Sequence, residues 1–174
     1  MREAGVGMKV MGIVGWSGSG KTSLLVELLP IITRKGIRVS TMKHAHHRFD
    51  VDKPGKDSFR HREAGASEVL VVTSSRWVLM HESREESEPS IESLIERMTP
   101  VDLLLIEGFK THHHPKLEIH RDSEGKPLLC PEDPEIVAVA SDIPLPDLKI
   151  PWLDLNDPSA IADFILVHTG LQQP

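Results

Sequence analysis

The sequence predicts an α/β fold, namely a doubly wound, mostly parallel sheet of the P-loop NTPase type with an antiparallel hairpin element. Three observations carry this prediction. Short apolar, β-rich runs alternate with segments whose apolar residues recur at helical spacing. A glycine-rich turn joins the first apolar run to the first helical segment. Two further apolar runs lie close enough together along the chain to pair as a hairpin.

The length and composition set the expected boundaries. The 174 residues suit one domain, and we expect a flexible leader at 1–7, a single nucleotide-binding domain at 8–170 and a tail at 171–174. The net charge of −6 and the scarcity of aromatic residues argue against nucleic-acid binding, and no segment approaches the length of a membrane span. Because the single cysteine, Cys130, cannot form an internal disulfide, a reducing cytoplasm is the expected compartment.

The first half of the chain is expected to run strand, helix, strand, loop, helix and hairpin. Leucines and isoleucines at helical spacing place a helix at 21–35, in which Pro30 predicts a kink or an early end and Gly36 a C-terminal cap. The polar stretch 43–58 is expected to be a long loop, and such loops in compact domains are usually functional or disordered. The other expected elements are strands at 8–14 and 37–42, a short helix at 59–64, and hairpin strands at 68–73 and 77–81.

The second half is expected to alternate helices with strands. Ser90 is the expected N-cap of a helix at 90–98, and Asp157 is the expected N-cap of a closing helix at 158–168 that has Pro158 at its first position. The strands between them are expected at 101–106, 117–120, 136–140 and 152–155.

Residues 15–22, GWSGSGKT, match the phosphate-binding pattern G-x-x-x-x-G-K-[ST] in full. The expected strand before the loop and helix after it supply the context that this pattern requires. Its glycines allow backbone N–H groups to converge on phosphate oxygens. Lys21 would reach the β- and γ-phosphates and is a candidate catalytic residue. The Thr22 hydroxyl would bind Mg²⁺. The candidate nucleotide-binding residues here are Gly15, Trp16, Ser17, Gly18, Ser19, Gly20, Lys21, Thr22 and Ser23.

A P-loop site also needs an acidic group near the metal, and the strand VDLLLIEGFK offers Asp102 and Glu107. The two are about 16 Å apart along a strand, so only one can face the phosphates. Ligands bind at the carboxyl ends of parallel strands. We therefore expect Glu107 to contact the metal or its water and to be catalytic, and Asp102 to lie at the opposite end. The alternative for Glu107 is an ordinary solvated carboxylate.

Two histidine clusters follow two of the expected strands: His44, His46 and His47 in one loop, and His112, His113 and His114 in the other. If both strands are parallel to the first, both clusters lie on the nucleotide face. Three interpretations stay open: a transition-metal site, contacts to an anionic ligand, or solvated loops. Lys43 and His44 are also candidates for nucleotide contact. The anion contacts would come from Lys43, His44, Arg48, Lys53, Lys56, Arg60, His61 and Arg62.

Three aspartates in the same stretch are candidates for a second metal contact or for positioning the attacking water: Asp50, Asp52 and Asp57. Asp57 is preferred as a catalytic residue because it is the expected N-cap of the next helix and would be held in place.

Five segments together resemble the MobB family of molybdopterin-guanine dinucleotide biosynthesis adapters. The segments are MKVMGIVGWSGSGKTSLL, TMKHAHHRFDVDKPGKDSFRHREAGA, DLLLIEGFK, VAVASD and LDLND, and the resemblance runs from about Met8 to His168. The resemblance implies a fold similar to the simpler P-loop GTPases, a homodimer, and GTP and Mg²⁺ as ligands with slow hydrolysis. It also implies a partner, the nucleotidyltransferase MobA, which joins GMP to molybdopterin; molybdopterin itself is a further candidate ligand.

No standard motif predicts which nucleotide base is bound, because the usual guanine motif N-K-x-D is absent. Asp142 follows an expected strand, and its carboxylate could accept from guanine N1–H and N2–H₂. The alternative is an aspartate that caps a helix or turn before Ile143-Pro144. The only glutamines, Gln172 and Gln173, lie in the tail, and no arginine finger is identifiable, which agrees with a slow GTPase acting as an adapter. The competing functions are a P-loop small-molecule kinase and a histidine-rich metal-insertion GTPase.

Overall fold

The computed structural model describes residues 7–45, 51–84 and 88–173. The expected leader therefore lies, apart from Gly7, outside the described residues, as do His46, His47, Arg48 and Asp50. The chain divides into two compact units. The first combines the residues up to His44 with those from Thr99 onward, and the second comprises Ala45–Met98. Each unit is described by itself, and the expected boundaries of a single domain stay a prediction.

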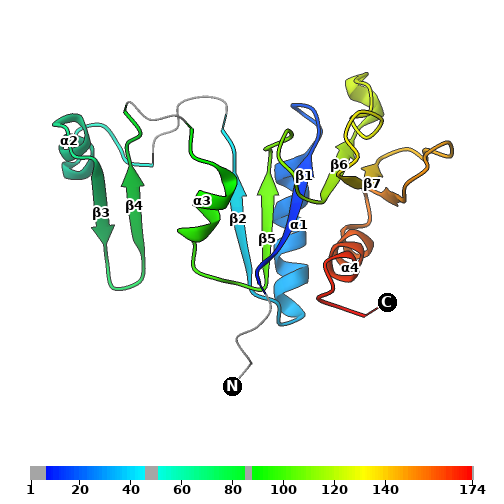
Figure 1. Cartoon of the computed structure of the whole chain (residues 1–174), viewed down its shortest axis with the longest axis horizontal. Helices are drawn as coiled ribbons and strands as arrows, with labels where there is room; N and C mark the ends of the chain where they lie inside the picture. The colour runs from blue at the N-terminus through cyan, green and yellow to red at the C-terminus, as the bar shows by residue number, and fades with distance from the viewer. Residues whose placement is uncertain (1–6, 46–50, 85–87, 174) are drawn as a thin grey trace. The chain divides into compact units, whose positions relative to one another are not determined.

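The described part of the first unit forms a six-stranded parallel sheet in the order β2-β5-β1-β6-β7-β8 (Figure 1). Each strand pairs with its neighbours in parallel, which confirms the mostly parallel α/β sheet that the sequence predicts. As a consequence, the carboxyl ends of all these strands meet at one edge. The strands are β1 (Lys9–Val14), β2 (Val39–Lys43), β5 (Leu103–Glu107), β6 (Lys116–His120), β7 (Ile136–Ser141) and β8 (Trp152–Asp154).

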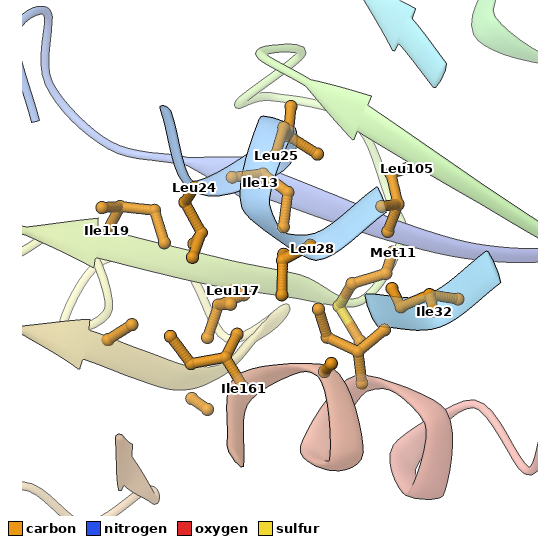
Figure 2. Packing of buried hydrophobic residues seen from close by; sticks show 14 of the residues in the cluster. Met11, Ile13, Leu24, Leu25, Leu28, Ile32, Leu105, Leu117, Ile119 and Ile161 are labelled. Atoms are coloured by element: carbon orange, nitrogen blue, oxygen red, sulfur yellow. The ribbon is translucent and has the colours of Figure 1, made fainter. Parts of the chain in front are cut away.

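The main core of this unit lies between the sheet and its two longer helices, α1 (Lys21–Arg34) and α4 (Pro158–His168) (Figure 2). Alternate strand residues such as Met11 and Ile13 point into this core, as expected for one face of a sheet. Leu28 of α1 is fully buried among them, and burying one such side chain stabilises the fold by about 1.5–3 kcal/mol. Asp157 caps α4 through the Ala160 N–H, as the sequence predicts.

Of the two outcomes predicted from Pro30, the early end is wrong, because α1 continues to Arg34, and the kink stays a prediction. Proline removes the N–H that would bond to the carbonyl of Val26. Pro30 and Val26 both lie on the exposed side of the helix, where water can satisfy that carbonyl. The buried side chain of Ile32, two residues after Pro30, holds the helix against the sheet. Gly36 has a positive φ of 80° and its N–H bonds to the Thr33 carbonyl, so the expected C-terminal cap is confirmed.

The second unit contains two short helices and a hairpin: α2 (Asp57–Glu63), β3 (Glu68–Val72), β4 (Trp77–His81) and α3 (Ile91–Glu96). The antiparallel pairing of β3 with β4 confirms the predicted hairpin. Ser90 caps α3 by accepting from the Ser93 N–H, as predicted. The expected N-cap at Asp57 is wrong: Lys56 has the extended cap conformation, and Asp57 is the first helical residue, where its charge still favours the helix dipole. Within the described residues, no helix is long and apolar enough to cross a membrane.

Candidate functional site

The glycine-rich loop lies between the end of β1 and the start of α1, as a phosphate-binding loop requires. Gly15, Gly18 and Gly20 all have positive φ, at 147°, 88° and 91°. At Gly15 a Cβ atom would also lie 2.4 Å from the Ile119 carbonyl oxygen, so only glycine fits there. Lys21 Nζ donates to the carbonyls of Gly15 (3.2 Å) and Trp16 (2.6 Å). The ammonium group is therefore held against the loop that would surround the phosphates.

Burial dominates the electrostatics of Lys21 and lowers its pKa, while the carboxylate of Glu107 opposes the shift. Lys110 and Lys43 contribute further lowering as neighbouring positive charges. Lys21, Lys43 and Lys110 lie near the positive end of the α1 helix dipole, where their charges repel one another unless an anion is bound. The loop is thus electrostatically suited to a polyanionic ligand.

Glu107 ends β5 at the carboxyl edge of the sheet, in register with Ile13 of β1 and Lys43 of β2. Its side chain is nearly buried and accepts a hydrogen bond from the Thr22 hydroxyl at 2.9 Å. Asp102 lies at the other end of the same strand, where it pairs with Arg38 at 3.1 Å. The positions expected for the two carboxylates are those observed.

The oxygens of Thr22 and Glu107 fit a bound Mg²⁺, which prefers such hard oxygen ligands and keeps several waters. A cation already lies at both atoms: Lys43 Nζ is 3.0 Å from Glu107 Oε1 and 3.4 Å from Thr22 Oγ1. An ammonium group is a stand-in with the same sign of charge as Mg²⁺, although it carries one charge rather than two. The metal-binding role of the two residues stays a prediction that this arrangement supports.

On the other side of β1, the segment after β6 contacts the same loop. Arg121 directly follows β6, and its Nε donates to the Ser19 carbonyl at 3.2 Å. Asp142 follows β7, and its Oδ1 accepts from the backbone N–H of Asp122, which begins a short 3₁₀ helix (Asp122–Glu124). Asp142 thus bonds to the segment after β6, while the Ile143 N–H donates to the Ser141 hydroxyl, and the role of Asp142 in base recognition stays a prediction. Sequence reasoning missed Arg121, although its position directly after a parallel strand was the signal that could have found it.

One member of each histidine cluster contacts Phe109, two residues after Glu107. The His44 ring stacks on the Phe109 ring at 4.5 Å between centroids, and the His112 ring approaches it edge-on at 5.0 Å. Phe109 has a φ of 51°, the left-handed region that a non-glycine residue rarely adopts, and its ring is buried. His44 and His112 therefore lie at one aromatic ring beside Glu107, at the carboxyl edge of the sheet where the parallel strands predicted them.

The other two described histidines of the second cluster lie in different surroundings. His113 is almost fully exposed, with Nδ1 3.3 Å from Glu135. His114 is buried over β1, where a Cβ atom at Gly12 would lie only 2.6 Å from its Nε2. Burial lowers the pKa of His114, and the positive charge of Lys116 lowers it further. Among the described residues, no group of three or more His, Cys, Asp or Glu side chains could hold a metal ion.

The remaining candidates belong to the second unit. Asp52 accepts from Arg62 Nη2 at 3.0 Å, and Arg62 also pairs with Glu82 at 3.6 Å. This largely buried pair helps hold the second unit together, which is a structural use of both residues. Asp57 lies in the first turn of α2, and its catalytic role stays a prediction. The remaining basic candidates of this unit are all exposed: Lys53, Lys56, Arg60 and His61.

Comparison with known proteins identifies close relatives. Residues 10–142 match the family model "MobB: Molybdopterin guanine dinucleotide synthesis protein B". The chain is 43% identical over 160 residues to the molybdopterin-guanine dinucleotide biosynthesis adapter protein of Escherichia coli, covering 90% of this chain and 91% of that protein. It is 45% identical over 159 residues to the adapter protein of the same name from Haemophilus influenzae, covering 90% and 86%. Among solved structures it resembles Bacillus subtilis MobB, with a TM-score of 0.72 and 25% identity over 93% of this chain and 98% of that one.

Proposed function

The chain belongs to the MobB family of molybdopterin guanine dinucleotide synthesis proteins, and from this premise we propose that it is a GTP-binding adapter. In this proposal it binds Mg²⁺·GTP, hydrolyses it slowly, and assists a MobA-like nucleotidyltransferase that attaches GMP to molybdopterin. Its site of action is the cytoplasm, and molybdopterin is a further candidate ligand. The names of the E. coli and H. influenzae relatives support the pathway, and the geometry of the loop supports the nucleotide.

The single observation that carries the nucleotide proposal is the contact between Thr22 and Glu107. These residues are far apart in the sequence, yet the hydroxyl of Thr22, in the first turn of α1, lies 2.9 Å from the carboxylate of Glu107 at the end of β5. A hydroxyl and a carboxylate beside a loop with converging N–H groups and a lysine are what phosphate-bound Mg²⁺ needs. A glycine turn without this function has no reason to bring the pair together.

Each part of the site has a proposed task. Lys21 Nζ gives up its hydrogen bonds to the Gly15 and Trp16 carbonyls and donates to the β- and γ-phosphates instead. The loop N–H groups bind the remaining phosphate oxygens. Mg²⁺, when bound by Thr22 and Glu107, neutralises charge on the phosphates. Asp142 releases the Asp122 N–H and accepts from guanine instead. A role of Asp57 in positioning the attacking water stays a prediction, and the absence of a glutamine from the described loops agrees with slow turnover.

Isothermal titration with GTP and ATP, each with and without Mg²⁺, tests the proposal. We expect GTP to bind more tightly than ATP, and Mg²⁺ to increase the affinity. A preference for ATP would favour the small-molecule kinase instead. Lys21→Ala serves as the negative control, because it removes the charge at the loop while leaving the buried core intact.

The homodimer in this proposal is supported by the hairpin of the second unit. Leu70 pairs with Leu79 and Val72 with Trp77, so all four side chains share one face of the hairpin. That face is solvent-exposed in the single chain, with Val72 at 68% and Trp77 at 65% exposure. Such a patch on a hairpin indicates a protein interface, and we propose a second copy of the chain as its partner.

Light scattering on the wild type and on the double variant Val72→Lys/Trp77→Lys tests the proposed dimer. We expect the wild type to be a dimer and the double variant to be a monomer. A monomeric wild type would contradict the proposal.

A further inference from the structure

The segment that follows β6 packs against the last residues of the phosphate-binding loop. Arg121 Nε donates to the Ser19 carbonyl at 3.2 Å. A Cβ atom added to Gly20 would lie 3.2 Å from Arg121 Nε and 3.3 Å from its Nη2. The guanidinium group therefore lies directly beside the point where the loop becomes α1, which is where a helix N-terminus attracts phosphate.

The strand order places Arg121 on a defined side of the site. β5, with Glu107, neighbours β1 on one side, and β6, which leads into Arg121, neighbours β1 on the other. β7 lies beyond β6, and Asp142 at its end is 3.6 Å from Arg121 Nη1. Arg121 lies between these two points. If a nucleotide binds with its terminal phosphate at Thr22 and its base toward Asp142, its α-phosphate lies beside Arg121.

Two carboxylates near this part of the loop oppose a phosphate there, so a phosphate needs a positive charge beside it. The Glu124 carboxylate approaches the loop, since a Cβ atom at Gly18 would lie 3.0 Å from its Oε1. Together with Asp142, it places negative charge on the side of the loop that the nucleotide has to approach. Arg121 offsets this charge with a group that stays protonated and has several N–H donors in one plane. Its Nε bond to Ser19 orients the remaining donors.

We propose that Arg121 is a nucleotide-binding residue that contacts the α-phosphate from the side of the loop opposite Glu107. The inference rests on the proposed function, because it assumes a guanine nucleotide in the loop. Arg121 contributes to affinity rather than to hydrolysis, since the bond that breaks lies at the Thr22 and Glu107 side. The charge-assisted contact should hold GDP and GTP equally.

Titration of GTP and GDP into wild type, Arg121→Ala, Arg121→Lys and Arg34→Ala tests the proposal. Arg34 ends α1, about 20 Å along the helix from the loop, and its substitution removes the same charge from an exposed position. We expect Arg121→Ala to lose about tenfold in affinity for both nucleotides, equivalent to about 1.4 kcal/mol, and Arg34→Ala to match wild type. Arg121→Lys should be intermediate, because it restores the charge without the Nε donor.

Melting temperatures without nucleotide separate binding from a structural role, and we expect Arg121→Ala to melt as wild type does. Unchanged affinity in Arg121→Ala would overturn the inference, with or without a lower melting temperature. A loss for GTP alone would also overturn it, because it would place Arg121 at the γ-phosphate. If the wild type binds no guanine nucleotide, the proposed function itself fails, so the two failures are distinguishable.

Discussion

Replacing Glu107 by glutamine should uncouple GTP binding from Mg²⁺. The amide oxygen can still accept from the Thr22 hydroxyl, now at 2.9 Å from Glu107 Oε1, so the local geometry is kept while the charge is lost. Without metal, the change removes a carboxylate that repels the phosphates, so affinity for free GTP should hold or rise. With metal, the change removes an oxygen ligand or a partner of a metal-bound water. The ratio of the two affinities should therefore fall.

The size of the effect follows from the burial and contacts of Glu107. The carboxylate is nearly buried and one hydrogen bond away from the Thr22 hydroxyl, so it acts on the metal directly or through one water. Removing such a partner typically costs about 10- to 100-fold in metal affinity, or about 1.4–2.7 kcal/mol. The ion pair with Lys43 is also lost, but the Lys43 side chain is 58% exposed, so the loss in folding stability should be about 1 kcal/mol or less.

Isothermal titration of GTP in Mg²⁺ and in EDTA measures the ratio directly. Asp102→Asn is the matched control, since it removes the same charge from the opposite end of the same strand. We expect the control to keep the wild-type ratio. A wild-type ratio in Glu107→Gln together with a lowered ratio in Asp102→Asn would refute the argument from strand ends.

Four other outcomes are expected. Lys21→Ala should weaken GTP binding by about 100-fold or more in the same titration, the loss of a charge-assisted contact of about 3 kcal/mol; near-normal affinity would remove the loop from the site. Gly12→Ala should cost about 1–3 kcal/mol in urea denaturation, because the new Cβ would lie 2.6 Å from His114 Nε2, and adding His114→Ala should recover much of the loss. The pKa of His114 is lowered, so the unfolded chain binds a proton that the folded chain does not, and the free energy of unfolding should fall as pH drops through about 6.5. His114→Gln should reduce that fall and His113→Gln, whose ring is exposed, should not. Burial and Glu118 raise the pKa of Cys130 to about 11, so iodoacetamide at pH 8 should modify it at least about tenfold more slowly than a free thiol; an equal rate would contradict the shift.

The parts of the site that could be predicted from the sequence are those that the strand register alone determines. Parallel strands share a carboxyl edge, so Glu107 had to lie near the loop after β1 and Asp102 had to lie away from it. The same reasoning brought His44 and His112 together, although not the ring of Phe109 between them. Strand and helix positions followed from apolar periodicity, which reports burial rather than contacts.

The parts that could not be predicted depend on which atoms fill a particular space. His114 is buried because Gly12 leaves room on β1, whereas the adjacent His113 is exposed, and no periodicity distinguishes the two. Pro30 failed as a helix stop because the penalty for a missing hydrogen bond depends on whether water reaches the freed carbonyl. Arg121 was missed because arginine after a strand has no pattern of its own, and its contact with Ser19 exists only in three dimensions.

The strand order also has a consequence for synthesis of the chain on the ribosome. β5 lies between β1 and β2 and pairs with both, but it is made only after the whole second unit has emerged. A nascent chain that ends at His44 therefore carries two strands with an unfilled place between them, and the carboxylate opposite Thr22 has not yet been synthesised. Non-local pairings of this kind fold slowly and leave strand edges exposed in the meantime. The phosphate-binding loop is made before the second unit, and its acidic partner can join it only when translation has passed Glu107.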